Sequence, residues 1–148
     1  MLTFSEIGLE RVTDSAWSTQ TIGTMLPSPN TLRNLLTLGG KLFAAELDGK
    51  IIGIAALTGR LHEAESIRSG VAENVLVLPQ YRRQGVGRML IGLLAGALMQ
   101  ENVYFLSGSV PNTVEAEAFA RKLGFQMQQG SSNALLDLTD TTGLRRQH

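Results

Sequence analysis

The order of predicted elements along this chain is that of an α/β (α+β) protein with a mixed sheet. Two observations carry this prediction. Two apolar runs flank an Asp-Gly pair at residues 48–49, which is typical of an antiparallel hairpin. Farther along, the apolar residues 75–78 lead through a turn with two glycines into a helical pattern, and strands and helices then alternate. We therefore expect the sheet to combine antiparallel and parallel pairs.

The composition fits one folded domain. A chain of 148 residues can bury a core, and we expect residues 1–148 to form a single domain with a frayed polar tail at 139–148. Lysine plus arginine and aspartate plus glutamate number 13 each, so the formal net charge is zero and does not favour nucleic acid as a partner. The absence of a long apolar run argues against a membrane partner, and the absence of a signal-peptide pattern predicts a cytoplasmic protein.

Metal sites and disulfides are not expected from this composition. The chain has no cysteine, which excludes disulfides, thiolate metal ligands and a cysteine nucleophile. It has two histidines, and one of them is the last residue, which argues against a histidine-based metal site.

The N-terminal region is predicted to form one strand and two helices. Residues 2–7 alternate weakly between apolar and polar side chains, as a strand does. The Thr-Asp-Ser cluster at residues 13–15 can cap a helix that runs toward Met25. Asn30 or Thr31 can cap a second, shorter helix.

A hairpin is predicted next. The glycine pair at residues 39–40 ends the preceding helix. Residues 41–47 and 50–57 are apolar runs on either side of the Asp-Gly pair, which favours the positive φ angles of a type I′ turn. Residues 58–70 are polar and are predicted to be a loop that connects to the central strand.

Strands and helices alternate in the second half of the chain. A long helix begins in the glycine turn, and its apolar residues recur at helical spacing: Val86, Met89, Leu90, Leu93, Leu94, Ala97 and Leu98. A second helix follows Pro111, where Asn112 with Glu115 three residues later resembles a capping box, and it ends at Gly124. The predicted strands around these helices are residues 75–78, residues 103–110, Phe125 and residues 134–138.

The turn between strand 75–78 and the long helix is a candidate anion site. The first backbone N–H groups of a helix have no partner inside the helix, and the helix dipole adds partial positive charge there. Gly85 and Gly87 lack the Cβ atoms that would keep a phosphate away from these groups. Three arginines flank the glycines: Arg82, Arg83 and Arg88. The alternative is a tight turn whose arginines are simply solvated.

Two common nucleotide motifs are absent from this turn. Leu90 occupies the third glycine position of the dinucleotide-binding fingerprint, and the Gly-Lys-Ser/Thr sequence of a Walker loop is missing. A general nucleotide-binding domain is therefore disfavoured.

At this turn the chain resembles a known family. Residues 77–90, Val-Leu-Pro-Gln-Tyr-Arg-Arg-Gln-Gly-Val-Gly-Arg-Met-Leu, resemble the acetyl-CoA signature of the GCN5-related N-acetyltransferase (GNAT) superfamily, whose core is Gln/Arg-x-x-Gly-x-Gly/Ala. Residues 116–125 look like the family's second motif, which closes the other side of the cofactor cleft. The resemblance implies a mostly antiparallel mixed sheet flanked by helices, with a splayed cleft for acetyl-CoA (CoA).

The resemblance also implies cofactor-binding roles for matched residues. The pyrophosphate would be received by the backbone N–H groups of Gln84, Gly85, Val86, Gly87 and Arg88. Positive charge would be added by the side chains of Arg82, Arg83 and Arg88. The strand end Leu76, Val77 and Leu78 would pair with the pantetheine arm, and the N–H of Leu76 or Val77 would stabilise an oxyanion. Thr113 stands where many members have asparagine, with Asn112 beside it, and both are expected near the cofactor.

Glu73 is the candidate catalytic base, because an attacking amine must first lose its proton. The family often places a carboxylate upstream on the same strand, and strict alternation would put Glu73 on one face with Val75 and Val77. An apolar cleft would raise the pKa of such a carboxyl toward the working pH. The alternative is a solvated residue at the start of the strand, or one member of an ion pair.

The predicted loop at residues 58–70 adds charges whose role stays open. Glu63 and Glu65 could attract a cationic substrate, or they are ordinary loop charges. His62 is expected to be a surface residue.

One position departs from the family pattern. Many members carry a tyrosine on the second helix that protonates the leaving CoA thiolate, and this chain has Ala120 there. Tyr104 on the preceding predicted strand is a candidate replacement, although half-buried packing is the alternative. A water molecule could also serve.

Two functions therefore stay open. The first is an N-acetyltransferase that uses direct attack by an amine of a small molecule, peptide or protein. The second is a catalytically weak regulatory protein that senses CoA or acetyl-CoA and acts through a protein partner; residues 28–32, 82–87 and 123–130 faintly resemble the maturation factor of aspartate decarboxylase. A homodimer through an edge strand or the C-terminal strand is a further expectation.

Overall fold

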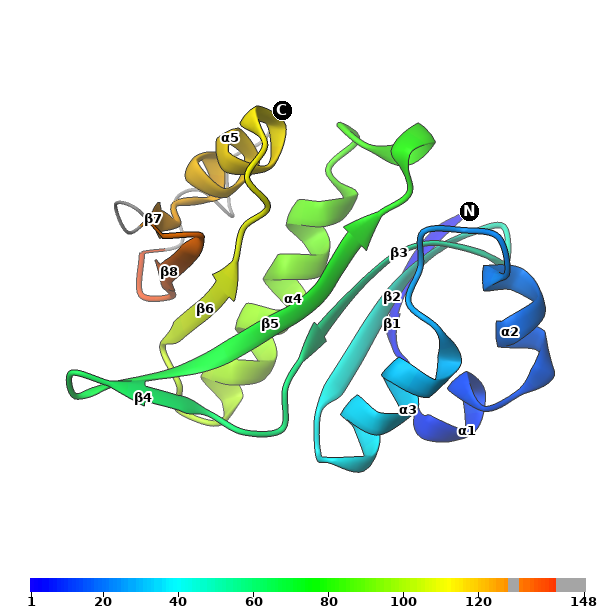
Figure 1. Cartoon of the computed structure of the whole chain (residues 1–148), viewed down its shortest axis with the longest axis horizontal. Helices are drawn as coiled ribbons and strands as arrows, with labels where there is room; N and C mark the ends of the chain where they lie inside the picture. The colour runs from blue at the N-terminus through cyan, green and yellow to red at the C-terminus, as the bar shows by residue number, and fades with distance from the viewer. Residues whose placement is uncertain (128–130, 141–148) are drawn as a thin grey trace.

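A mixed sheet forms the centre of the computed structural model, which describes residues 1–127 and 131–140 (Figure 1). The strand order is β1-β2-β3-β5-β6-β8-β7, with β4 paired to β5. Only β5 and β6 pair in parallel among the described strands, so the mostly antiparallel mixed sheet is confirmed. The strands are β1 (Leu2–Glu6), β2 (Lys41–Leu47), β3 (Lys50–Leu57), β4 (His62–Ala64), β5 (Ile67–Val77), β6 (Phe105–Ser109), β7 (Gln126–Met127) and β8 (Asn133–Asp137).

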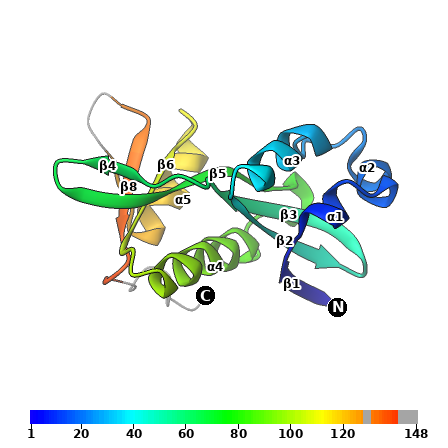
Figure 2. The ribbon, with the colours of Figure 1, turned by 90° about the horizontal axis from the view of Figure 1, so that it is seen from below.

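Helices cover both faces of the sheet, and α3 and α4 lie on opposite sides (Figure 2). The helices are α1 (Leu9–Val12), α2 (Ser15–Thr21), α3 (Pro29–Thr37), α4 (Val86–Gln100) and α5 (Val114–Leu123), with a 3-10 turn η1 (Pro79–Tyr81) before α4. Within the described part of the chain, every helix is too short or too polar to span a bilayer.

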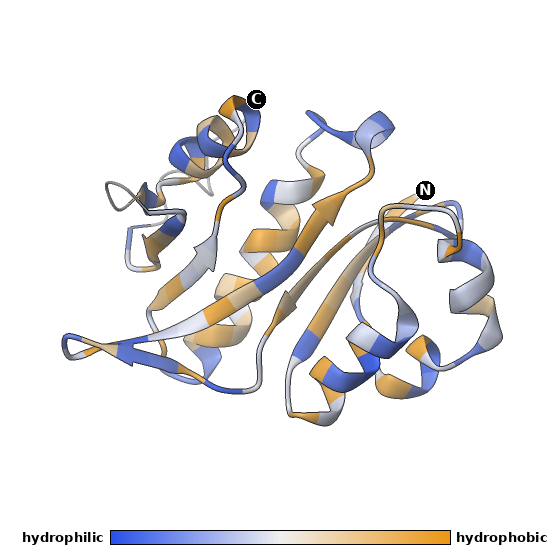
Figure 3. Ribbon diagram, in the orientation of Figure 1, coloured by the Kyte–Doolittle hydropathy of each residue, from blue (hydrophilic) through white to orange (hydrophobic). Residues whose placement is uncertain are grey.

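The sheet separates two apolar clusters. The cluster on the α4 face is built around Leu90, Leu94 and Leu98, and the cluster on the other face joins α1, α2 and α3 through residues such as Trp17 and Leu32. Burying each of these side chains contributes about 1.5–3 kcal/mol. Figure 3 shows the resulting apolar colouring along β2, β3 and α4, interrupted by polar residues in the middle of β5. β5 therefore carries polar side chains in an otherwise apolar layer.

The Asp-Gly hairpin is confirmed, whereas the predicted helix caps are displaced. Asp48 and Gly49 have φ angles of 50° and 82°, as a type I′ turn requires. The cap of α3 is Ser28 and not Asn30 or Thr31, because Pro29 occupies the first helical position and the Thr31 N–H donates to Ser28 Oγ at 3.2 Å.

The helix expected from residues 13–15 to Met25 is also shorter than predicted. Its cap is Asp14, whose side chain accepts a hydrogen bond from the Ala16 N–H, and α2 ends at Thr21. The separate turn α1 precedes it and was not predicted. Residues 22–28 contain Gly23, Pro27 and Ser28, and they carry the chain across to α3 without continuing the helix.

The segment predicted as a loop, residues 58–70, contains β4 and the start of β5 instead. The two strands form a hairpin that projects from the sheet (Figure 1). Its turn consists of Glu65 and Ser66, with φ angles of 52° and 69°. The sequence signal for a hairpin is weak here because residues with side chains, and not glycines, adopt the positive φ angles.

The two C-terminal helices differ from prediction in detail. Met89, predicted on the apolar face of α4, is 53% exposed, and Ile91 and Ala95 are buried instead. Thr113 and not Asn112 caps α5, because its hydroxyl accepts a hydrogen bond from the Ala116 N–H at 3.1 Å. Of the predicted tail, residues 141–148 lie outside the described residues.

Candidate functional site

β5 and β6 share a short parallel ladder and then separate. Residues 70–72 of β5 pair with residues 106–108 of β6, and beyond that point no described strand pairs with residues 73–77 on this side. The unpaired edge of β5 is roughly 16 Å long. Figure 1 shows the two strands diverging toward the ends from which α4 and α5 follow. We call this unpaired edge of β5, residues 73–77, the fork.

Two serines fasten the strands where the fork begins. The Ser107 hydroxyl donates to the Gly70 carbonyl at 3.2 Å, and the Ser69 hydroxyl donates to Ser107 Oγ at 3.2 Å. Ser69 is buried and Ser107 is half-buried, so this pair of hydrogen bonds is partly shielded from water. The serines therefore help to set how far the parallel ladder extends.

Val77 presents its backbone to the fork. The Leu78 N–H donates to the Ile52 carbonyl at 2.8 Å, and the alternation of an antiparallel ladder then directs the N–H and C=O of Leu76 toward β3 as well. Val77, between them, points its N–H and C=O the other way. The expectation that Leu76, Val77 and Leu78 all serve a ligand in the fork is corrected to Val77.

A β-bulge interrupts β5 at Asn74. Asn74 has a φ of 53°, and the register with β3 shifts between Ile54 and Ala56. Strict alternation predicted Glu73 on the same face as Val75 and Val77, which is wrong. Because the bulge inserts one residue, Glu73 and Asn74 both face α3, whereas Val75 and Val77 pack into the cluster on the α4 face.

The N-terminus of α4 offers backbone donors. The first intrahelical bond runs from the Met89 N–H to the Gly85 carbonyl at 3.1 Å, so the N–H groups of Val86 and Gly87 precede the helical ladder. Gly85 is the N-cap residue, with a φ of 83°, and as a glycine it has no side chain to accept hydrogen bonds from these N–H groups. The first turn contains no acidic residue. A diphosphate fits this donor set.

The two glycines of this turn have different structural roles. Gly85 needs its positive φ, and a Cβ there would have Arg88 Nη2 as its near neighbour at 3.3 Å. A Cβ on Gly87 would lie 3.0 Å from the Phe119 ring of α5. Both glycines were predicted to make room for phosphate, but the structure gives Gly87 a packing reason. Phe119 of α5 lies against this glycine of α4.

The three arginines also differ. Arg82 is half-buried, and its Nε donates to the Val77 carbonyl at 2.8 Å, which fastens the turn to the end of β5. Arg83 is exposed with a φ of 65°, next to the exposed Gln84. Arg88 is half-buried beside Gly85. Arg82 therefore mainly holds the turn against the end of β5, whereas Arg83 and Gln84 are exposed at the surface of the turn.

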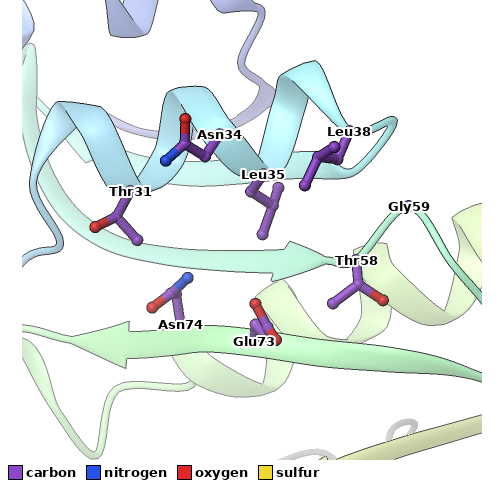
Figure 4. Close-up of a pocket in the computed structure, with 8 residues that line it drawn as sticks. All are labelled: Thr31, Asn34, Leu35, Leu38, Thr58, Gly59, Glu73 and Asn74. Carbon is purple, nitrogen blue, oxygen red and sulfur yellow. The ribbon is translucent and has the colours of Figure 1, made fainter.

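A groove lies on the other side of β5, between it and α3 (Figure 4). It has a volume of about 370 Å³ and is lined by Thr31, Asn34, Leu35, Leu38, Thr58, Gly59, Glu73 and Asn74. Glu73 is the one ionisable group among these residues, and it is exposed rather than enclosed by apolar side chains as predicted.

Several lining residues were not singled out from the sequence. Three on α3, at positions 31, 34 and 35, and Leu38 directly after it follow helical spacing, which is a detectable signal only if one knows which face is exposed. Asn74 interrupts an apolar strand, and this interruption could have indicated a bulge.

The position of Tyr104 contradicts its predicted catalytic role. It is 42% exposed, its hydroxyl donates to Asn102 Oδ1 at 3.4 Å, and it precedes β6. Counting along both strands, four residues separate it from Gly108 and five more separate Ala72 from Val77, which together span roughly 30 Å. Tyr104 therefore lies at the opposite end of the sheet from the α4 turn.

The remaining candidates lie at the edges of the site. Asn112 and Thr113 are exposed between β6 and α5, and the Thr113 hydroxyl is engaged as the helix cap. Ala120 is buried. His62, Glu63 and Glu65 lie on the exposed β4–β5 hairpin. Away from the site, hydrogen bonds from the side chain and then the backbone of Thr139 lower the pKa of the Asp137 carboxyl.

Comparisons with known proteins agree with this geometry. Residues 39–127, more than half of the chain, match the acetyltransferase (GNAT) domain family. Probable N-acetyltransferase 14 of Danio rerio is 32% identical over 100 residues, which cover 66% of this chain and 34% of that protein. The chain thus spans about a third of the length of this curated relative.

Two solved structures share the fold. The ribosomal-protein-S18-alanine N-acetyltransferase from Escherichia coli aligns with a TM-score of 0.69 and 21% identity over 93% of this chain and 94% of that one. A predicted acetyltransferase with acetyl-CoA from Clostridium acetobutylicum aligns with a TM-score of 0.62 and 15% identity over 88% and 93% of the two chains.

Proposed function

This chain belongs to the GNAT acetyltransferase family, and we propose that it transfers an acetyl group from acetyl-CoA to an amine of a small molecule, peptide or protein. One observation carries the proposal: the N-terminus of α4, which has no side-chain cap, follows the unpaired edge of β5 after one short turn. An anion site and a strand edge without a partner strand therefore occur on consecutive elements, as a ligand with a diphosphate and an amide-bearing arm requires.

The donor side of the site is built from backbone. The N–H groups of Val86 and Gly87 would hold the diphosphate of acetyl-CoA, and the edge of β5 that faces the fork would lie along its pantetheine arm. Acetyl-CoA supplies a thioester whose carbonyl carbon accepts an amine. The Val77 N–H is the chain's candidate donor for the oxyanion that develops, and one such donor is typically worth about 3 kcal/mol.

The acceptor side is built from side chains. The groove between α3 and β5 would hold the amine, and Glu73 would accept the proton that the ammonium loses, directly or through a water molecule. Because Glu73 is exposed, that proton can pass on to solvent. The fork is the edge of β5 toward β6 and the groove lies on the face of β5 toward α3, so the two substrates would approach the same strand from different directions.

Because Ala120 stands where the family usually has a tyrosine, the CoA-sensing regulatory protein remains a second candidate function. A buried methyl group stands where many members have a tyrosine, and Tyr104 lies too far away to replace it. A thiolate would then be protonated by water. This observation favours slow turnover, and it is what a protein that binds CoA in order to regulate a partner would also show.

Binding and turnover, measured separately, test the proposal. Calorimetry with acetyl-CoA measures binding, and a free-thiol assay over a panel of amines and peptides measures transfer, with mass spectrometry of the acetylated product. Amine-dependent thiol release supports the acetyltransferase. Tight binding without release on any acceptor supports the regulatory protein, and the absence of binding would contradict both.

A further inference from the structure

The acceptor groove has an unusual set of polar groups for a site that would hold an amine. Its eight lining residues include one carboxylate, two asparagine side chains and two threonines, and no cation. Leu35 of α3 and Leu38, which directly follows α3, add apolar side chains to one wall (Figure 4). These features together narrow the class of acceptor that the groove can hold.

The single carboxylate disfavours polycations. A polyamine or an aminoglycoside carries several ammonium groups, and the groove provides one negative partner, Glu73. The other ammonium groups would gain no ion pair there. The absence of a cation among the lining residues disfavours anions in the same way, because the carboxylate of a free amino acid would have no positive partner.

The asparagines favour an amide. An asparagine side chain carries one acceptor and two donors, so it can bind both the C=O and the N–H of a peptide unit. Asn34 on α3 and Asn74 on β5 stand on opposite walls of the groove (Figure 4). Amide-bearing ligands can therefore be bound from either side.

The bulge in β5 is what places Asn74 in the groove. In a regular strand, Asn74 would face α4 while Glu73 faced α3. With φ at 53°, Asn74 instead joins Glu73 on the α3 face, and asparagine tolerates this backbone conformation better than most residues. The fold thus presents a carboxylate and an amide from consecutive residues.

We infer that the acceptor is an amine adjacent to an amide, as the α-amine of a peptide is, and that Asn34 and Asn74 determine this specificity. The inference rests on the proposed acetyl transfer. In it, Glu73 pairs with the ammonium, while the two asparagines bind the first peptide unit. Leu35 and Leu38 contact the first side chain.

Four acceptors test the inference on the full chain. Two are pentapeptides with an amidated C-terminus: one has neutral side chains and a free N-terminus, and the other is N-acetylated and carries a lysine at its centre. The other two are spermidine and free alanine. We expect kcat/KM for the free N-terminus to exceed the other three by about 10-fold or more. Higher kcat/KM for spermidine or alanine would overturn the inference and leave acetyl transfer itself intact.

Two variants separate amide recognition from groove shape. Asn34 lies on the exposed face of a helix, where alanine is well tolerated, and glycine can adopt the positive φ of position 74. Both variants, Asn34→Ala and Asn74→Gly, should therefore fold. Each should raise KM for the pentapeptide about 3- to 10-fold, the loss expected for one hydrogen bond, with KM for acetyl-CoA unchanged. Asn30→Ala, on the same helix outside the groove, is the matched control. Equal losses on all four acceptors would contradict the role of the asparagines.

A binding measurement distinguishes failure of this inference from failure of the proposed function. If acetyl-CoA binds but no acceptor is acetylated, acetyl transfer is refuted. Calorimetric titration of the pentapeptide into the CoA-bound protein then tests the groove by itself. Binding that Asn34→Ala and Asn74→Gly weaken supports amide recognition, and binding no tighter than that of spermidine overturns it.

Discussion

The two sides of β5 use different chemistry. On the fork side the functional groups are backbone: the Val77 edge and the first N–H groups of α4. On the groove side they are side chains, with Glu73 and Asn74 opposite the polar residues of α3. One strand therefore separates a site defined by main-chain conformation from a site defined by residue identity.

This difference predicts which substitutions matter on each side. Backbone donors survive most side-chain changes, and they are lost only when a substitution alters φ or fills the space of a glycine. Side-chain groups are lost one at a time, without a change in the fold. Substitutions on the fork side should thus change affinity for acetyl-CoA, and those on the groove side should change the acceptor or the rate.

The largest expected effect is on the groove side. Glu73→Gln removes the proposed base and should lower kcat about 100-fold, with the affinity for acetyl-CoA unchanged, because Glu73 faces away from the α4 turn. Stopped assays of thiol release and calorimetry measure the two quantities. Glu63→Gln, on the exposed β4–β5 hairpin, is the control. A wild-type rate in Glu73→Gln would leave the groove without a catalytic group.

The next effect is on the fork side and combines strain with lost binding. Gly85→Val places a β-branched residue at a φ of 83°, which costs about 1–2 kcal/mol of stability. It should also weaken acetyl-CoA binding about 10- to 100-fold, since the side chain crowds the diphosphate donors.

Gly23→Val controls for the strain. Gly23 has a φ of 75° and open space around it, away from the α4 turn. Thermal unfolding should show similar losses in the two variants, and calorimetry should show lost affinity only for Gly85→Val. Equal affinities in both would refute the diphosphate assignment.

A smaller effect should separate the arginines of the turn. Arg82→Leu removes the hydrogen bond to the Val77 carbonyl and should cost about 1 kcal/mol of stability, along with a few-fold loss of acetyl-CoA affinity. Arg83→Leu should not change stability, and its effect on affinity should vanish at high salt, because an exposed charge acts at long range. If the affinity for acetyl-CoA depended on salt in the same way in both variants, the structural role of Arg82 would be contradicted.

The smallest effect lies on neither side of β5. The Thr139 side chain is the larger cause of the lowered pKa of Asp137. Thr139→Ala should raise that pKa part of the way toward its ordinary value. A carboxyl with a lowered pKa adds stability at neutral pH that is lost as the pH falls through it, so the variant should lose less stability on acidification. NMR titration of Asp137 measures the shift, and acetyl transfer should stay unchanged.

The donor side could largely be predicted from the sequence. Gly85 and the helix after it occur within a few consecutive residues, and a helix N-terminus binds anions whatever surrounds it. The hairpin at Asp48-Gly49 was predictable for the same reason. The acceptor side was harder to predict from the sequence, because its walls come from α3 and β5, which are far apart in the chain.

The sequence by itself determined the mixed α/β class, the hairpin at Asp48-Gly49 and the glycine turn before α4, because each depends on local φ preferences or on the spacing of apolar residues. Only the tertiary structure decided where β5 leaves β6 and that Phe119 packs on Gly87. It also decided that a bulge turns Asn74 toward α3 and that Tyr104 lies at the far end of the sheet. These features depend on register between distant strands, and a shift of one residue reverses the face on which a side chain lies.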